Sequence, residues 1–244
     1  MKKHIPLLAL GALLSGCGNT EPVAWRVLVD GTNTLSNAIF SGAHKTHIAA
    51  LAPAGHTPVA CNVFLIRDAS TQQNVLIDTG MGGALMAELE AAGLQPGDIT
   101  DILVTHSHFD HVGGLLAADG ETPAFPEATL HITRPELDFW RAHQPAQAAA
   151  CEEAYPLSII VPDGQTPVAT MDLVALDASG HTPGHVVFLY KGNRLFAGDL
   201  LHSELLQFTS PEICASYDND AEAAAAARRR ILGRAADEKW VFHA

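Results

Sequence analysis

THSHFDHVGG, residues 105–114, places three histidines and an aspartate within six positions of one short turn. His106 and His108 are two residues apart, so in an extended backbone both side chains project to the same side and can bind one cation. Asp110 and His111 follow at once and point elsewhere, which suits a second cation beside the first. The stretch therefore predicts a metal site.

Two further turns carry similar residues at the ends of expected strands. The metal-site turn follows an apolar strand at 102–105, and open α/β arrangements place ligand sites at the carboxyl ends of strands. SGHTPGH, residues 179–185, puts His181 on a turn rich in Gly and Pro. FAGDL, residues 196–200, puts Asp199 at the end of another strand. Chance is a poor explanation for three such strand ends in one chain.

Short runs rich in Val, Ile, Leu and Phe, bounded by Gly, Pro, Asn or Asp, predict the strands of the protein. The expected strands are 23–29, 59–66, 74–77, 102–105, 129–133, 172–176, 186–190, 194–197 and 239–242. Helical patterns predict helices at 83–92, 134–143 and 220–236. Segment 143–170 contains four prolines and is interpreted as a long, partly irregular excursion, either a lid over the site or a surface insertion.

The first residues have the architecture of a secretory signal. Lys2 and Lys3 form a basic start, and a short apolar run covers 5–14. Small residues then precede Cys17. This apolar run is too short to span a bilayer permanently, so the segment is excluded from the fold.

The segment LSGC, residues 14–17, resembles the lipobox of bacterial lipoproteins. The resemblance implies cleavage before Cys17 and acylation of its thiol; an ordinary signal peptide with an incidental cysteine is the alternative. We expect a signal peptide at 1–16, a tether at 17–22 and one domain at 23–244. Lipid chains on Cys17 would hold an exported domain at the periplasmic face of a bacterial membrane without a spanning helix.

Composition and charge narrow the classes of function. The chain has 244 residues, 48% of them hydrophobic, which suits one well-buried domain. Its formal net charge is −13, and loss of the two lysines in 1–16 leaves 12 basic against 27 acidic side chains, or −15. Such a surface repels a phosphate backbone, so a nucleic-acid partner is excluded.

Besides the acylated Cys17, three cysteines would remain after cleavage, and an exported domain faces an oxidising compartment. They are Cys61, Cys151 and Cys214. One disulfide of undetermined pairing and three unpaired apolar side chains are both consistent with the sequence.

Taken together, three motifs resemble the metallo-β-lactamase superfamily in residues, order and spacing: HSHFDH at 106–111, GHTPGH at 180–185 and GD at 198–199. LIDTG, residues 76–80, resembles the strand and turn that precede the metal motif in that family. The resemblance implies an α+β fold, a four-layer αββα sandwich of two mixed β-sheets flanked by helices. It also implies a dinuclear metal site at one edge of the sandwich.

The family pattern assigns the metal ligands by position. It implies that the first cation is held by His106, His108 and His181, the second by Asp110, His111 and His243, and both by a bridging Asp199. Zn²⁺ is the default for such imidazole and carboxylate ligands, although Mn, Fe or Co would also fit. Two such ions can hold a hydroxide between them, lower its pKa and polarise a substrate oxygen.

The last of these ligands stands at the end of the chain. In related proteins more chain usually follows the final histidine. Either His243 is the ligand, or the sequence stops just before it and the domain at 23–244 is truncated at its C-terminus.

Further residues near the motifs have open roles. Asp78 either orients a ligand histidine or only forms its turn. His202, three residues past Asp199, either faces the substrate as an acid or hydrogen-bond donor or is a partly buried polar residue. Asp110 and His202 are thus the candidate catalytic residues. His185 is expected to brace the turn of His181, and the histidines expected on the surface or in loops are His44, His47, His56, His131 and His143.

Differences between this sequence and known branches of the superfamily narrow the range of expected activities. The β-lactamases lack the aspartate that Asp199 would supply, glyoxalase II carries an extra helical domain for which this chain leaves no room, and nuclease members need a surface that attracts polyanions. The layout is most similar to the lactonase and methyl-parathion-hydrolase-like group. Lactonases of this fold, however, often carry a tyrosine where this chain has His202.

The leading hypothesis is a metal-dependent hydrolase of a small ester, lactone or phosphotriester. A sulfur enzyme of the same fold, either a thioesterase or a persulfide dioxygenase, is one alternative, and a non-catalytic metal-binding lipoprotein is another. The expected partner is a small-molecule substrate, and the membrane is contacted only through the lipid on Cys17. The pattern leaves the oligomeric state open.

Overall fold

The computed structural model describes residues 23–164 and 166–244. The expected signal peptide at 1–16, the lipid-bearing Cys17 and the tether at 17–22 lie outside the described residues. Within the described part, no helix is both long and apolar enough to cross a membrane.

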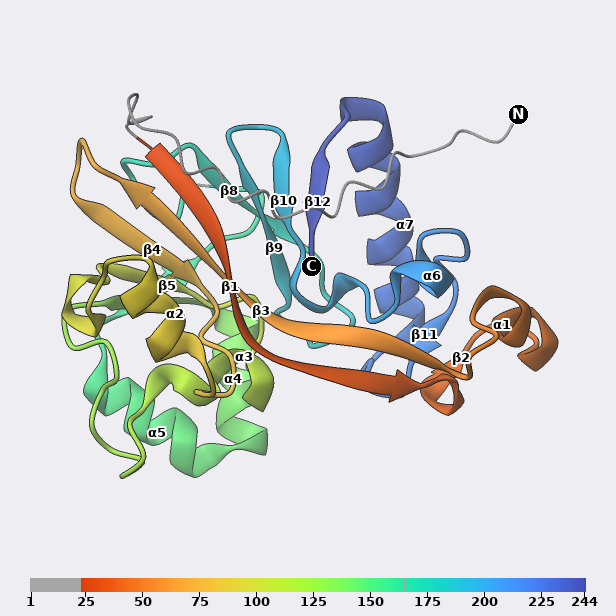
Figure 1. Cartoon of the computed structure of the whole chain (residues 1–244), viewed down its shortest axis with the longest axis horizontal. Helices are drawn as coiled ribbons and strands as arrows, with labels where there is room; N and C mark the ends of the chain where they lie inside the picture. The colour runs from red at the N-terminus through yellow and green to blue at the C-terminus, as the bar shows by residue number, and fades with distance from the viewer. Residues whose placement is uncertain (1–22, 165) are drawn as a thin grey trace.

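Two mixed β-sheets form the centre of the fold (Figure 1). The strands of the larger sheet are, in spatial order, β1 (Val23–Ser36), β3 (His56–Asp68), β4 (Gln73–Ile77), β5 (Asp101–Leu103), β6 (Thr129–Thr133) and β7 (Leu157–Ile160). Those of the second sheet are β12 (Val241–His243), β10 (Arg194–Phe196), β9 (Val186–Tyr190) and β8 (Leu173–Asp177). A short pair joins β2 (Phe40–Ser41) to β11 (Cys214–Ala215). β4 to β7 run parallel, whereas β1, β3 and β4 are antiparallel neighbours.

Helices cover the two outer sides of this pair of sheets (Figure 1). The α-helices are α1 (Lys45–Leu51), α2 (Leu85–Ala91), α3 (Phe109–Val112), α4 (Arg134–His143), α5 (Pro145–Ala154), α6 (Glu204–Gln207) and α7 (Ala221–Glu238). α2, α4 and α5 pack on the larger sheet, and α7 packs on the second sheet, whereas α1 and α6 lie apart near β2 and β11 (Figure 1). The expected four-layer α+β sandwich is confirmed.

The alternating direction of side chains along the strands explains how the layers pack. In β3, Val63 and Leu65 pack toward the helices, while Phe64 and Ile66 pack between the sheets. Successive side chains of a strand point to opposite faces, so a continuous apolar run fills both layers at once. β9 repeats the pattern with its own alternate residues. The runs of Val, Leu, Ile and Phe in the sequence are therefore strands buried on both faces.

Each strand predicted from the sequence has a counterpart, but β1 and β3 are longer than predicted. They pair from Val23–Asp68 to Ser36–His56, with a bulge between Val29 and Gly31. The end of this ribbon contacts a small separate apolar cluster that includes residues of α1 and α6. Residues 30–36 are mostly polar or glycine, so their composition does not predict a strand. They are part of β1 because they pair with β3.

The segment at 143–170 is more regular than predicted. It begins with α5 and continues with β7, which adds the edge strand next to β6. Pro145 stands in the first turn of α5, where its missing N–H costs little. The Ala-rich helix buries Ala148 and Cys151, so its apolar face is too small to give a clear period in the sequence.

The three described cysteines are unpaired. Cys151 and Cys214 are buried, and Cys61 is partly exposed with its Sγ 3.0 Å from the carbonyl oxygen of Asp110. The structure thus matches the alternative of unpaired side chains.

Candidate metal centre

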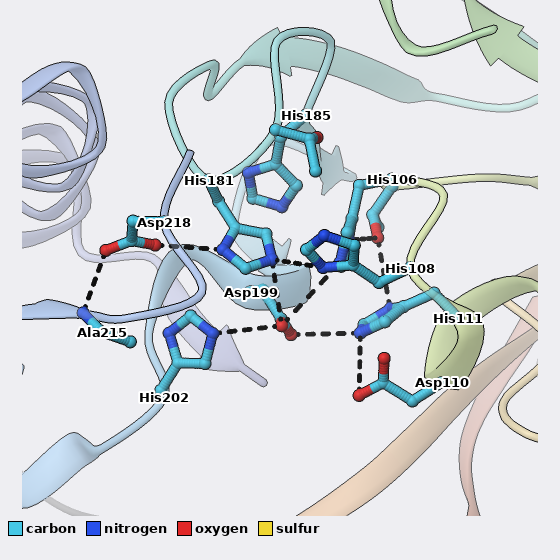
Figure 2. A network of polar contacts seen from close by, with 12 residues as sticks. His106, His108, Asp110, His111, His181, His185, Asp199, His202, Ala215 and Asp218 are labelled. Carbon is cyan, nitrogen blue, oxygen red and sulfur yellow. Dashed lines mark hydrogen bonds and ion pairs between the residues drawn. The ribbon is translucent and has the colours of Figure 1, made fainter. Parts of the chain in front are cut away.

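The predicted metal motifs meet at one edge of the sandwich (Figure 2). His106 and His108 follow β5 of the larger sheet, whereas His181 lies between β8 and β9 of the second sheet. Asp199 follows β10 of the second sheet. Strands of both sheets therefore deliver their carboxyl-terminal loops to a single cluster.

The first group of donors consists of His106, His108, His181 and Asp199, which each offer one ligand atom within 4.8 Å of the others. His106 Nε2 lies 3.1 Å, and His181 Nε2 lies 2.9 Å, from His108 Nδ1. Asp199 Oδ2 lies 3.3 Å from His181 Nε2. Three ring nitrogens and a carboxylate oxygen thus converge on one point.

The second group adjoins the first through the same aspartate. Asp110, His111 and Asp199 also offer ligand atoms within 4.8 Å of one another. His111 Nε2 lies 3.1 Å from Asp199 Oδ1 and 3.9 Å from Asp110 Oδ2. Asp199 therefore presents one oxygen to each group, as a bridging ligand would.

The chemistry of these donors fits divalent cations. Nitrogens around a tetrahedral Zn²⁺, each 2.0–2.1 Å from the ion, lie about 3.4 Å apart. The ring nitrogens of the first group approach this spacing at 2.9 and 3.1 Å. Imidazole and carboxylate donors also suit Mn, Fe and Co, so the donors select a class of metal ion rather than one element.

Asp78 contacts His111 at the ring nitrogen that faces away from the donor cluster. Its Oδ2 lies 2.7 Å from His111 Nδ1, and its carboxylate also accepts from the backbone N–H and the hydroxyl of Thr105 at 2.8 and 2.7 Å. Asp78 has a φ of 62°, a left-handed conformation rare for residues other than glycine. Of the two roles open from the sequence, the structure shows the orienting one, which leaves His111 Nε2 directed at the donors.

When no cation is bound, burial and nearby charges shift the pKa values of the histidines in different directions. Desolvation lowers the pKa of His106 well below its usual value and that of His108 to about 4, so both rings are neutral at pH 7. Burial alone would lower the pKa of His111, but the carboxylates of Asp199 and Asp78 outweigh it and raise that pKa well above the usual value.

Asp218 is a functional candidate that sequence reasoning missed. Its fully buried carboxylate lies 3.0 Å from His181 Nδ1 and also accepts from the backbone N–H of Ala215 (Figure 2). Arg228 of α7 lies behind it, with Nη2 3.5 Å from Asp218 Oδ2. In the sequence, Asp218 cannot be told apart from Asp220, which caps α7 two residues later.

His202 lies beside the cluster, as expected from its place after Asp199. Its Nε2 is 3.2 Å from Asp199 Oδ2, and neither ring nitrogen has a partner with hydrogen-bond geometry among residues 23–164 and 166–244. Its ring lies 5.8 Å from that of Tyr217, which is 48% exposed. His202 is thus a buried polar ring next to Asp199.

His243 is not brought to the cluster. It pairs with Phe196 in the β12–β10 ladder, and its ring stacks on Phe196 and lies 4.4 Å from that of Trp25. It belongs to none of the donor groups among the described residues. Strand pairing and aromatic packing direct it between the sheets, so its assignment as a ligand stays a prediction.

Two other histidines are buried. His185 braces the turn of His181 as expected, with Nδ1 3.1 Å from the carbonyl oxygen of Ala178. The prediction of a surface or loop position for His131 was wrong: it is 5% exposed in β6, with Nε2 2.8 Å from Asp101 Oδ1. The neighbouring strand supplies that carboxylate, which no local sequence pattern reveals.

Known proteins share both the fold and parts of the sequence. The AidC protein, described as a dizinc quorum-quenching lactonase in complex with the product N-hexnoyl-L-homoserine, superposes with a TM-score of 0.79 at 27% identity. The superposition covers 90% of this chain and 86% of that one. AbOPH, a hydrolase in the β-lactamase superfamily, has a TM-score of 0.76 at 24% identity over 92% and 87% of the two chains, which shows the fold alone.

Curated relatives match a shorter part. A hydroxyacylglutathione hydrolase from Jannaschia sp. (strain CCS1) is 33% identical over 140 residues, 57% of this chain and 46% of the relative. One from Fuscovulum blasticum is 29% identical over 159 residues, 63% and 54% of the two. The chain spans about half the length of the curated relatives it matches. The family model of the metallo-beta-lactamase superfamily matches residues 56–238, so this chain belongs to that superfamily.

Proposed function

We propose that the protein is a metal-dependent hydrolase that acts on a small, uncharged ester, lactone or phosphotriester. The observation that carries the proposal is the pair of adjoining donor groups that share Asp199. The similarity to AidC over most of both chains supports a lactone or ester substrate.

The ligands form two sets, one for each of two cations. His106, His108 and His181 would hold the first, Asp110 and His111 the second, and Asp199 both. Bound Zn²⁺ ions would activate water as the nucleophile and polarise the substrate oxygen.

Other side chains favour an uncharged organic substrate. Phe109, between two proposed ligands, is 57% exposed, and Tyr217 beside His202 is 48% exposed. Exposed aromatic rings bind apolar groups well. The chain carries a net charge of −13, which disfavours anionic substrates. His202 would donate a hydrogen bond or a proton to the substrate next to Asp199.

A thioester is the second candidate substrate. The curated relatives quoted above carry the name hydroxyacylglutathione hydrolase, and they match 57–63% of this chain. The proposed centre would serve either bond, because attack on a carbonyl carbon leads to an oxyanion in both cases.

A substrate panel with metal analysis tests the proposal. The purified full chain is loaded with Zn²⁺ and assayed with an acyl-homoserine lactone, an aryl ester, a phosphotriester and S-lactoylglutathione. We expect about two zinc ions per chain, turnover of the oxygen esters or lactone, and loss of activity in Asp199→Ala. Asp237→Asn, an exposed change on α7, is the control and should be active.

The other outcomes separate the alternatives. Turnover of only the thioester would move the assignment to the second candidate. Oxygen-dependent turnover with one iron per chain would indicate a persulfide dioxygenase. Bound metal without any turnover would contradict the hydrolase and leave a metal-binding lipoprotein.

We further propose that residues 1–16 are removed and that lipid on Cys17 holds the domain at 23–244 on the periplasmic face of a bacterial membrane. The proposal is supported by the LSGC segment at 14–17. Labelling of cells with a radioactive fatty acid should mark the protein, and Cys17→Ala should abolish both the label and membrane recovery. Labelling of the Cys17→Ala variant would contradict the anchor.

A further inference from the structure

Glu136 is a fully buried carboxylate that no motif explains. It lies in the first turn of α4, and its exposed fraction is 0%. Oε1 accepts from the backbone N–H and the hydroxyl of Ser107, both at 2.7 Å. Oε2 accepts from the hydroxyl of Thr182 at 2.6 Å and from the backbone N–H of Gly184 at 3.0 Å. Each oxygen thus binds a different loop.

The two loops are those that carry the proposed ligands of the first cation. Ser107 stands between His106 and His108, and Thr182 follows His181. One loop leaves the larger sheet after β5, and the other joins two strands of the second sheet. Glu136 therefore links two loops, one from each sheet, that carry the converging ring nitrogens.

The contacts around this link are close. A Cβ on Gly184 would collide with the backbone of Glu136 and with the hydroxyl of Thr133, so glycine lets the loop approach α4. Thr133 caps α4 and donates its hydroxyl hydrogen to the carbonyl oxygen of Gly184 at 2.8 Å. Gln144 donates to the carbonyl oxygen of Ser107 at 2.9 Å. α4 thereby holds both loops by side-chain and backbone contacts.

Burial of a carboxylate costs more free energy than burial of an apolar side chain of similar size. Among the residues that the structure describes, no cationic side chain forms an ion pair with Glu136. Only hydrogen bonds and the N-terminal end of the α4 dipole offset its desolvation. An apolar side chain would avoid that cost, but it would not determine the distance between Ser107 and Thr182.

We propose that Glu136 is a positioning residue that sets the separation of the two loops and so the affinity and geometry of the first cation site. The proposal rests on the metal centre of the proposed function, but it concerns residues outside the donor set. It implies that the two loops are coupled through one carboxylate.

Glu136→Gln tests the role with little change in shape. The amide nitrogen cannot accept, so one loop loses its acceptor while the other keeps it. We expect the affinity for Zn²⁺, measured by competition with a chromophoric chelator, to fall about 10–100-fold. Glu153→Gln removes the same charge from an exposed position on α5 and should bind Zn²⁺ like the parent.

A spectroscopic readout distinguishes positioning from support of the fold. In the Co²⁺-loaded protein, Glu136→Gln should change the position and intensity of the visible absorption bands, which report coordination geometry. Ser107→Ala and Thr182→Val each remove one hydroxyl donor, and should weaken Zn²⁺ binding less and non-additively with Glu136→Gln. These two variants also carry the test if Glu136→Gln does not fold.

The outcomes are separable. A parent protein without Zn²⁺ affinity would overturn the proposed metal centre and this inference together. If the parent binds Zn²⁺, unchanged affinity and an unchanged Co²⁺ spectrum in the folded variants would overturn the positioning role alone. A lower melting temperature of the metal-free variant with unchanged affinity would also overturn it, because Glu136 would then serve only the fold.

Discussion

The residues of the metal centre differ in how far the sequence reveals them. His106, His108, Asp110 and His111 stand in one turn, so their spacing alone predicts a shared site. The partners that orient the histidines of the centre, His181 among them, come from distant positions. Asp218 is 37 residues from the histidine that it contacts. A contact over such a distance leaves no local period or spacing in the sequence.

His202 is expected to act in turnover rather than in metal binding. His202→Ala should lower kcat by about 10²–10⁴-fold if the ring passes a proton or a hydrogen bond to the substrate. Zinc content should remain that of the parent. Steady-state kinetics with parallel metal analysis checks this, and His56→Ala, an exposed change in β3, is the control. An unchanged kcat would reduce His202 to a packing role.

Binding of the second cation should release a proton. The pKa of His111 is raised well above its usual value without metal, so the ring is protonated at pH 7 and must lose a proton to bind at Nε2. Below that pKa, the affinity should therefore rise about tenfold per pH unit. The first cation meets His108, whose pKa is lowered to about 4 by burial, and should show little pH dependence near pH 7. Calorimetric titration with Zn²⁺ in buffers of different ionisation enthalpy checks this; equal proton release at both steps would contradict it.

At the scale of elements, α4 was predicted with its observed bounds, whereas α5 and β7 were not recognised. α4 has a Thr133 cap, a proline in its first turn and an amphipathic pattern. α5 presents small alanines on all sides, and β7 is defined by pairing with β6. Within α2, Leu85 and Leu89 are buried, whereas Met86 is 38% exposed.

α7 is expected to support the centre through Arg228. This buried side chain donates to the carbonyl oxygens of Leu200, Pro211 and Ile213 at 2.8–2.9 Å. Arg228→Met removes the donor to the carbonyl oxygens of Leu200 and Pro211, and one of the donors to Ile213 and Asp218. The free energy of unfolding should fall by about 3–5 kcal/mol, as found for broken buried pairs. Urea unfolding checks this, and Arg229→Met, an exposed change one residue later, should fall within about 0.5 kcal/mol of the parent. An equal fall in the free energy of unfolding in both variants would show that the buried contacts of Arg228 do not stabilise the fold more than an exposed arginine does.

At the scale of the whole molecule, the proposed ligands tie the two sheets together. His106 and His108 come from the larger sheet, and His181 and Asp199 from the second. Cations bound only by the folded arrangement stabilise it by mass action, by about 2.7 kcal/mol at 100 times the dissociation constant. For a chain of this size, chelation should lower the melting temperature by about 5–10 °C. Calorimetry with and without a chelator measures the shift, and Asp199→Ala should show a smaller one. An identical melting temperature with and without metal would contradict coupling between the sheets.

The sequence by itself determined the strands and the chemical class of the centre. Short apolar runs predicted the strands, the three motifs at strand ends predicted the donors, and the resemblance of these motifs to the superfamily implied the four layers. These features are local, so neighbouring residues specify them. Only the tertiary structure decided that Asp218 contacts His181, that Glu136 links the two ligand-bearing loops and that His243 packs between the sheets. Those placements depend on contacts between segments far apart in the chain, which form only when both sheets and their helices are packed together.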